Sequence, residues 1–234
     1  MASLSKRRAR TALLFSVLMT VGIYTFPLGD LIAYPLVLLS TLAHELGHGI
    51  AALMVGCSFE QFVLYSDGSG AALTSGNPGR LARAFISAGG LLGPAVAAYG
   101  CFMAGRNGRA ARRALIAVGA MLAVALVLVI RNAFGWIFVA SVAGVCFYCG
   151  SRARRDTAQL VVLFVGIQLA LSVFSRSDYL FTSVAITANG NGPSDVARMA
   201  EALFLPYWVW GLVCGAFSLW VLWQGLRSFL RDTA

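Results

Sequence analysis

Long apolar runs, separated by short polar or basic segments, dominate the hydrophobic pattern of this chain. A helix needs about 20 apolar residues to cross a bilayer. Seven runs approach or exceed that length, at residues 11–26, 31–55, 81–104, 114–130, 133–149, 157–174 and 203–226. The pattern therefore predicts an all-α polytopic membrane protein with about six to seven transmembrane helices.

Two stretches do not fit a membrane span. Residues 57–79 combine short apolar segments with the turn sequence Asp-Gly-Ser-Gly at 67–70, which predicts a short membrane-associated β-hairpin after the second span. Residues 175–201 are polar, and glycine and proline at 190–193 would break a helix there. Broken backbone at membrane depth is tolerated where it is buried in protein or lines a cavity. We therefore expect this broken polar stretch to line a cavity.

The composition agrees with a membrane protein that forms a single domain over residues 1–234. The chain is 59% hydrophobic and 12% charged, whereas soluble domains average about 25% charged residues. The net charge of +9 is that of some nucleic-acid-binding proteins. Here, however, the basic residues form short clusters at the ends of apolar runs, as cytoplasmic loops do. We expect the lipid bilayer as a partner and no nucleic acid.

The basic clusters also bear on topology. Residues 1–10 are basic and precede an apolar run without a cleavage site, which is typical of an uncleaved anchor with a cytoplasmic start. The basic residues at 106–113, 152–155 and 227–231 share one side if the later spans alternate. Three full spans after the N-terminus would put Arg106 on the opposite side of the membrane from the basic N-terminus. The first or second segment must therefore be re-entrant, or the hairpin region must pass through the membrane. Small size and short arginine-rich loops favour a bacterial plasma membrane.

The second apolar run contains His44-Glu45-Leu46-Gly47-His48, the His-Glu-x-x-His zinc motif, and these are the two histidines of the chain. Residues four apart share a helix face, so both imidazoles can reach one Zn²⁺ at ~2.0–2.1 Å. Glu45 can then act as the general base toward a water molecule. Ionisable groups in hydrocarbon are costly unless they have a function. The motif therefore predicts a zinc metalloendopeptidase.

A catalytic zinc site usually has three protein ligands and one open position. Since the chain has no third histidine, a carboxylate is expected, and elimination among the nine acidic residues leaves Asp178, Asp195 and Glu201. Each has another possible role. Ser194 or Asp195 would make an ordinary helix N-cap, and Asp178 can pair with Arg176 at the membrane interface. The residues alone leave this choice open.

The motif at residues 43–49 and a late aspartate together resemble the site-2 protease group of zinc metallopeptidases, the M50 family. The second motif of that family is Asn-x-x-Pro-x-x-x-Leu-Asp-Gly, followed by a basic residue. Residues 189–199 approach it, with Pro193, Asp195 and Arg198 in the same order. The family leucine and glycine are replaced by serine and valine. This short form is similar to the compact M50B-like subgroup, which lacks PDZ and CBS domains.

The resemblance implies a zinc-dependent enzyme that cuts a peptide bond in a membrane-embedded, single-span segment of a protein substrate. By the family pattern, His44, His48 and Asp195 would bind Zn²⁺, and Glu45 would be the catalytic base. Asp178 remains the alternative third ligand. The resemblance therefore selects among ligands that the residues leave open.

The family pattern also implies substrate-binding groups. Its motif asparagine has only shifted candidates here, Asn189 and Asn191, which are possible substrate-binding residues. The family hairpin, which presents an unwound substrate by strand addition, would correspond to residues 59–74. The pattern specifies no oligomeric state.

Two other functions compete with the protease. A catalytically inactive relative could bind metal or a membrane partner as a scaffold, and the departures around Asp195 favour it. A transporter with a broken-helix site at the membrane midplane is disfavoured because the chain has no internal repeat. The intact Glu45 and the motif spacing favour the protease, and they also argue against simple polar pairing within a helix bundle.

Overall fold

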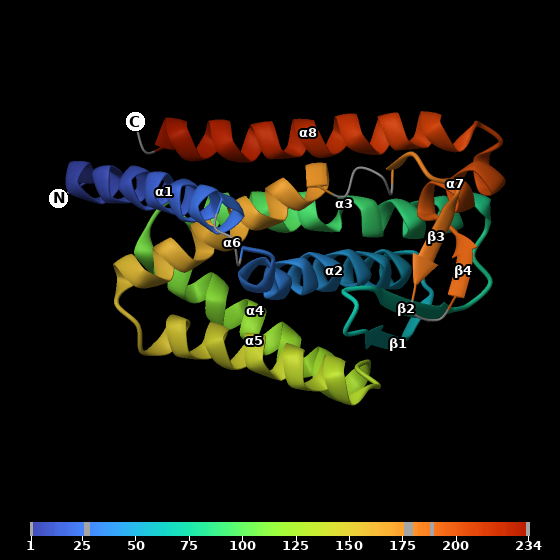
Figure 1. Ribbon diagram of the computed structural model, residues 1–234, viewed down its shortest axis with the longest axis horizontal. Coiled ribbons are helices and arrows are strands. Elements are labelled where there is room, and N and C mark those ends of the chain that lie inside the picture. Colours follow the sequence, from blue (N-terminus) through green and yellow to red (C-terminus); the bar gives the residue numbers. More distant parts are fainter. Residues whose placement is uncertain (1, 26–28, 176–179, 188–189, 233–234) are drawn as a thin grey trace.

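The computed structural model describes residues 2–25, 29–175, 180–187 and 190–232 (Figure 1). Helices and two small hairpins make up this part of the chain. In chain order, they are α1 (Ala2–Thr25), α2 (Gly29–Met54), β1 (Ser58–Leu64), β2 (Gly70–Ser75), α3 (Arg80–Ala104), α4 (Gly108–Leu128), α5 (Ala133–Ser151), α6 (Arg155–Ser175), β3 (Val184–Thr187), β4 (Gly190–Pro193), α7 (Asp195–Leu203) and α8 (Tyr207–Asp232).

Six helices of the described chain are long and apolar enough to cross a membrane: α2, α3, α4, α5, α6 and α8. The apolar part of α1, Ala9–Ile23, is shorter. The predicted all-α polytopic fold is confirmed. The last span begins at Tyr207 rather than near residue 203, because α7 ends in a left-handed residue, Phe204 (φ 66°), before Pro206.

Glycines bring α2 and α3 into backbone contact at the centre of the molecule (Figure 1). A Cβ atom at Gly47 of α2 would lie 2.2 Å from the carbonyl oxygen of Gly89, and one at Gly93 would lie 2.4 Å from that of Ala43. Small residues permit this approach in membrane helices. The contact fixes α2, which contains His44 and His48, against α3.

α1 and α2 run in the same direction along the molecule. Ala9 packs with Phe102 and Phe229, which lie near the ends of α3 and α8, whereas α2 ends beside the hairpin that leads into the start of α3 (Figure 1). Together α1 and α2 therefore pass along the molecule once. This arrangement explains how Arg106 can lie on the same side as the N-terminus. The chain passes along the molecule once in α1 and α2 together, and the loop at Arg106 is back at the end where the chain starts.

The predicted hairpin after α2 is confirmed. β1 and β2 pair antiparallel, with a register shift between Phe59 and Gln61. A second antiparallel hairpin, β3–β4, lies in the stretch that the sequence indicated only as broken and polar. Both hairpins lie at the end of the molecule away from the termini (Figure 1).

The outer edge of β1 is covered by the α4–α5 turn. Phe62 donates its N–H to the Val129 carbonyl (2.7 Å), and Arg131 donates to the Phe62 carbonyl (3.1 Å). The side-chain amide of Asn132 donates to the Leu64 carbonyl (2.6 Å) and accepts from the Leu64 N–H (3.2 Å). The open edge of this hairpin is therefore the edge of β2.

Candidate metal centre

His44 and His48 lie one turn apart on α2 and point to the same side. Their Nε2 atoms are 3.1 Å apart. The Nδ1 atom of His48 lies 2.8 Å from the carbonyl oxygen of Ile86 on α3. Since a carbonyl can only accept, Nδ1 carries the proton and donates, which leaves the Nε2 lone pair directed into the site. A backbone carbonyl in this role is typical of metal-ligating histidines.

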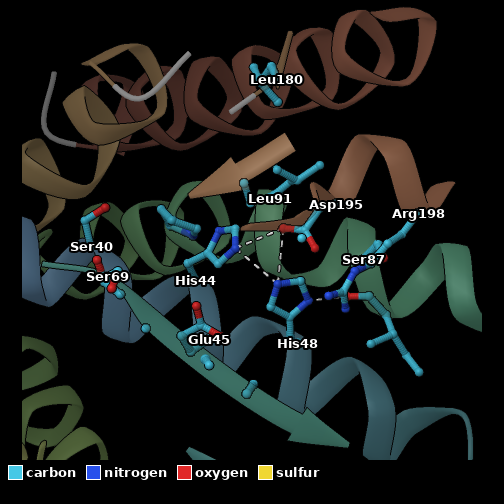
Figure 2. A pocket seen from close by; sticks show the side chains of 18 of the residues that line it. Ser40, His44, Glu45, His48, Ser69, Ser87, Leu91, Leu180, Asp195 and Arg198 are labelled. Carbon is cyan, nitrogen blue, oxygen red and sulfur yellow. Dashed lines mark hydrogen bonds and ion pairs between the residues drawn. The ribbon is translucent and has the colours of Figure 1, made fainter. Parts of the chain in front are cut away.

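Asp195, the first residue of α7, completes the group. Its Oδ2 atom lies 3.1 Å from Nε2 of His44 and 3.3 Å from Nε2 of His48 (Figure 2). The helix cap is Ser194, whose hydroxyl accepts from the Ala197 N–H (3.2 Å) and donates to the Thr182 carbonyl (2.6 Å). The Asp195 side chain is therefore not needed as the cap.

The spacing of these three donor atoms suits a zinc ion. One ligand atom from each of the three residues lies within 4.8 Å of the other two. A tetrahedral site with bonds of ~2.0–2.1 Å has an edge of about 3.3–3.4 Å between ligands, close to the distances between the three atoms. Burial favours the neutral form of Asp195, but His48 and His44 favour the carboxylate, and the net effect is a pKa below its ordinary value. The donor set is thus two imidazole nitrogens and one carboxylate.

Glu45 is buried beside this group and contacts the β1–β2 hairpin. A Cβ atom at Gly70 of β2 would lie 2.9 Å from Cγ of Glu45. The absence of a side chain at Gly70 therefore lets β2 pass close to the carboxylate. Figure 2 places Glu45 between the two histidines and β2.

A cavity of about 370 Å³ surrounds the three donor atoms and Glu45. β2 and the β3–β4 hairpin both line it, as do the facing sides of α2 and α3 and parts of α6 and α8. Arg198, which projects from α7 toward Ser87 in Figure 2, is the basic residue of the lining.

The structure brings four predicted residues together, namely His44, Glu45, His48 and Asp195. Asn191 lies on β4 and lines the same cavity. Asp178 and Asn189 lie outside the described residues. Glu201 is exposed on α7 and is not part of the three-residue group.

Two features of α3 were not predicted. One is the Ile86 carbonyl that orients His48. The other is Gly90, where a Cβ atom would lie 2.1 Å from Nε2 of His48. The Gly-Gly pair at 89–90 within an apolar run was a visible signal of close packing, but a backbone carbonyl has no signature in the sequence.

Comparison with known proteins identifies a peptidase family. A family model described as "Peptidase M50B-like" matches residues 9–225, which is most of the chain. No curated protein and no solved structure matches the chain. The matched region includes α2, both hairpins and α7, and so contains all four residues of the candidate centre. The chain belongs to the Peptidase M50B-like family.

Proposed function

We propose that this integral membrane protein is a zinc metalloendopeptidase that hydrolyses a peptide bond in the membrane-embedded segment of a protein substrate. The observation that carries the proposal is the convergence of His44, His48 and Asp195 beside the buried Glu45 in one cavity. Membership in a peptidase family supports it at the level of the reaction class.

His44, His48 and Asp195 would hold the zinc ion. Bound there, zinc would act as a Lewis acid toward a substrate carbonyl and make water more acidic. The hydrogen bond from His48 to Ile86 keeps the imidazole in the tautomer that a metal ligand needs. With three protein ligands, a zinc ion held there would remain open to water or substrate.

Glu45 has the position of a general base. It follows the first histidine of the motif, lines the cavity and is not one of the three donor residues. Its carboxylate would accept a proton from the attacking water and pass it to the leaving amine. Because Glu45 is only 7% exposed, bulk solvent would compete little for that proton.

The β1–β2 hairpin would bind the substrate by strand addition. The β1 edge is occupied by the α4–α5 turn, and the open β2 edge lines the cavity. An extended segment on β2 would pass next to Glu45, since Gly70 lies against that side chain. Strand addition suits hydrolysis because the scissile backbone must leave its helix to be cut.

The decisive test compares the purified protein with a Glu45→Gln variant. We expect zinc in both proteins and cleavage of single-span substrates only by the parent, because the substitution removes the base but none of the three ligands. Zinc content is measured by mass spectrometry of the metal and cleavage by gel analysis. Equal cleavage by both would refute this mechanism, and zinc without any cleavage by the parent would favour the scaffold.

The third ligand is tested with Asp195→Ala and Asp178→Ala. We expect Asp195→Ala to lose zinc, because it removes one of three donors, and Asp178→Ala to retain it. Zinc retention after dialysis against a chelator reports the result without reference to activity. Loss of zinc by Asp178→Ala alone would reverse the assignment.

A bacterial plasma membrane, with the basic end of the protein in the cytoplasm, is the setting we propose. It follows from the clusters of arginine that flank the spans.

A further inference from the structure

We infer that the substrate binds as a central strand between two open edges, that of β2 and that of β4, and not on β2 alone. This inference rests on the proposed function and adds to it a second binding edge. An extended segment with free backbone N–H groups at consecutive residues is then the class of substrate that the site recognises.

The open edge of β2 presents the backbone groups of Gly70 and Ala72. In antiparallel pairs, hydrogen-bonded and non-hydrogen-bonded residue pairs alternate. The bond from the Tyr65 N–H to the Ser69 carbonyl (2.9 Å) makes the next pair, Leu64 with Gly70, a non-hydrogen-bonded one. The backbone groups of Gly70 and Ala72 therefore point away from β1. Within the described chain, they make no hydrogen bond on that side.

The same alternation sets the open edge of β4. The Ser194 N–H donates to the Ser183 carbonyl (3.0 Å), so Asn191, three pairs along, is in a non-hydrogen-bonded pair with Ile186. The Asn191 N–H and C=O therefore point away from β3. They too have no partner among the described residues.

Proline limits the β4 edge to a single pairing residue. Pro193 also points outward, but it has no N–H, and its carbonyl already accepts from Nε of Arg198 (3.3 Å). β4 therefore offers one donor and one acceptor, both from Asn191. A proline on an open edge is a common way to restrict pairing with other strands.

Both edges border the cavity that contains the candidate metal centre. All four residues of β4 line it, whereas only Ala185 of β3 does. Figure 2 shows β2 on one side of the histidines and the second hairpin on the other. Gly70, Ala72, Gly190 and Gly192 are small residues of this lining, and a Cβ atom added at Gly190 or Gly192 would meet no atom within 4 Å.

This arrangement predicts which substrate amides matter. Along a strand, the N–H groups of successive residues point to opposite edges. Binding to β2 alone would use every second N–H. Binding between β2 and β4 would use two N–H groups toward Gly70 and Ala72 and also the intervening N–H, which would meet the Asn191 carbonyl. Three consecutive amides would therefore contribute to affinity.

An ester scan of a synthetic substrate tests this prediction. The probe is a lysine-flanked alanine–leucine peptide of about 22 residues with a central Gly-Ala-Gly-Ala segment, long enough to span a bilayer. Each ester replaces one N–H with oxygen. The Kd of each ester peptide for the zinc-loaded Glu45→Gln protein in nanodiscs is measured by fluorescence. The variant is used so that binding is measured without cleavage. We expect Kd to rise about threefold to tenfold at three consecutive positions, as for the loss of one hydrogen bond each.

Matched variants assign the middle position. Asn191→Pro removes the outward N–H but keeps the carbonyl, and it is compatible with pairing to β3 because the Asn191 N–H makes no hydrogen bond to that strand. Asn191→Ala keeps the N–H and removes the side chain. In the Asn191→Pro background, we expect Kd for the all-amide peptide to rise about threefold to tenfold, because the carbonyl of the middle residue loses its donor, whereas Asn191→Ala, which keeps that N–H, should not raise it. The middle ester should still weaken binding to Asn191→Pro, because the carbonyl of residue 191 remains. Asn191→Ala should leave the effect of the middle ester unchanged.

The two proposals can fail separately. Sensitivity that alternates along the peptide, or is absent at the middle position, would overturn the second edge and leave the protease intact. A parent protein that never cuts would overturn the proposed function, while three consecutive sensitive amides in the binding assay would still support the two-edged site.

Discussion

Gly90 determines how closely α3 can approach the histidines. It lies one helical turn from Ile86, whose carbonyl holds His48, so one face of α3 both orients the imidazole and leaves space for it. The sequence predicted His44 and His48 because their spacing alone puts them on one face. It left Asp195 open, because a contact between residues 147 positions apart depends on how α7 is docked.

A substitution at Gly90 should weaken metal binding. The added methyl of Gly90→Ala would overlap Nε2 of His48, forcing the ring or α3 to move. We expect a loss of zinc affinity of about 10–100-fold, as for changes in groups that orient metal ligands. Competition with a chelator measures it. Gly100→Ala, on the same helix but with nothing within 4 Å of its Cβ, is the control, and equal affinities in the two variants would contradict the prediction.

The two hairpins differ in how visible they are in the sequence. The first has apolar residues and an Asp-Gly turn, and Asp67 accepts from the N–H (2.8 Å) and hydroxyl (2.7 Å) of Ser69 there. Those bonds hold the pKa of Asp67 below its ordinary value. The second hairpin includes Gly-Asn-Gly-Pro as one strand, a sequence typical of turns. Its pairing with β3 therefore could not be predicted from the local sequence.

Asn132 is a positioning residue for the first hairpin. Asn132→Ala removes both bonds to Leu64, each of which would contribute about 0.5–1.5 kcal/mol. We expect faster amide exchange in β1 and β2, and a KM for single-span substrates that rises more than kcat falls, because in the proposed function the hairpin binds the substrate and holds none of the three zinc ligands. Asn132→Asp keeps the acceptor for the Leu64 N–H and should have a different, partial effect. Unchanged exchange in both variants would show that the Asn132 side chain does not hold the hairpin.

At the scale of the whole molecule, the basic clusters of the sequence lie at one end. The α3–α4 and α5–α6 loops lie at the same end as both termini (Figure 1), and Arg106 pairs there with Asp232 at 2.6 Å. The hairpins lie at the other end. Segment lengths alone left this arrangement unresolved, because the direction of α1 relative to α2 depends on packing against α3, α6 and α8.

The positive-inside rule predicts that the end with the termini is cytoplasmic. In a background with the five native cysteines replaced, Arg109→Cys should react with a membrane-impermeant maleimide only when the cytoplasmic face is exposed. Asn77→Cys, at the hairpin end, should react from the opposite face. Both positions are exposed in the structure. Labelling of both from one side would mean that the spans do not alternate as the fold requires.

The proposed zinc ligands come from α2 and α7, which are joined by nearly 150 residues of chain. A metal ion held by both would therefore act as a reversible cross-link between the two parts of the protein. By mass action, a ligand bound only to the folded state stabilises it by about 2.7 kcal/mol at a free concentration 100 times its Kd. The thermal stability of this protein would then depend on free zinc, and the second hairpin, which is joined directly to α7, would be the part of the fold that loosens first when the metal is withdrawn.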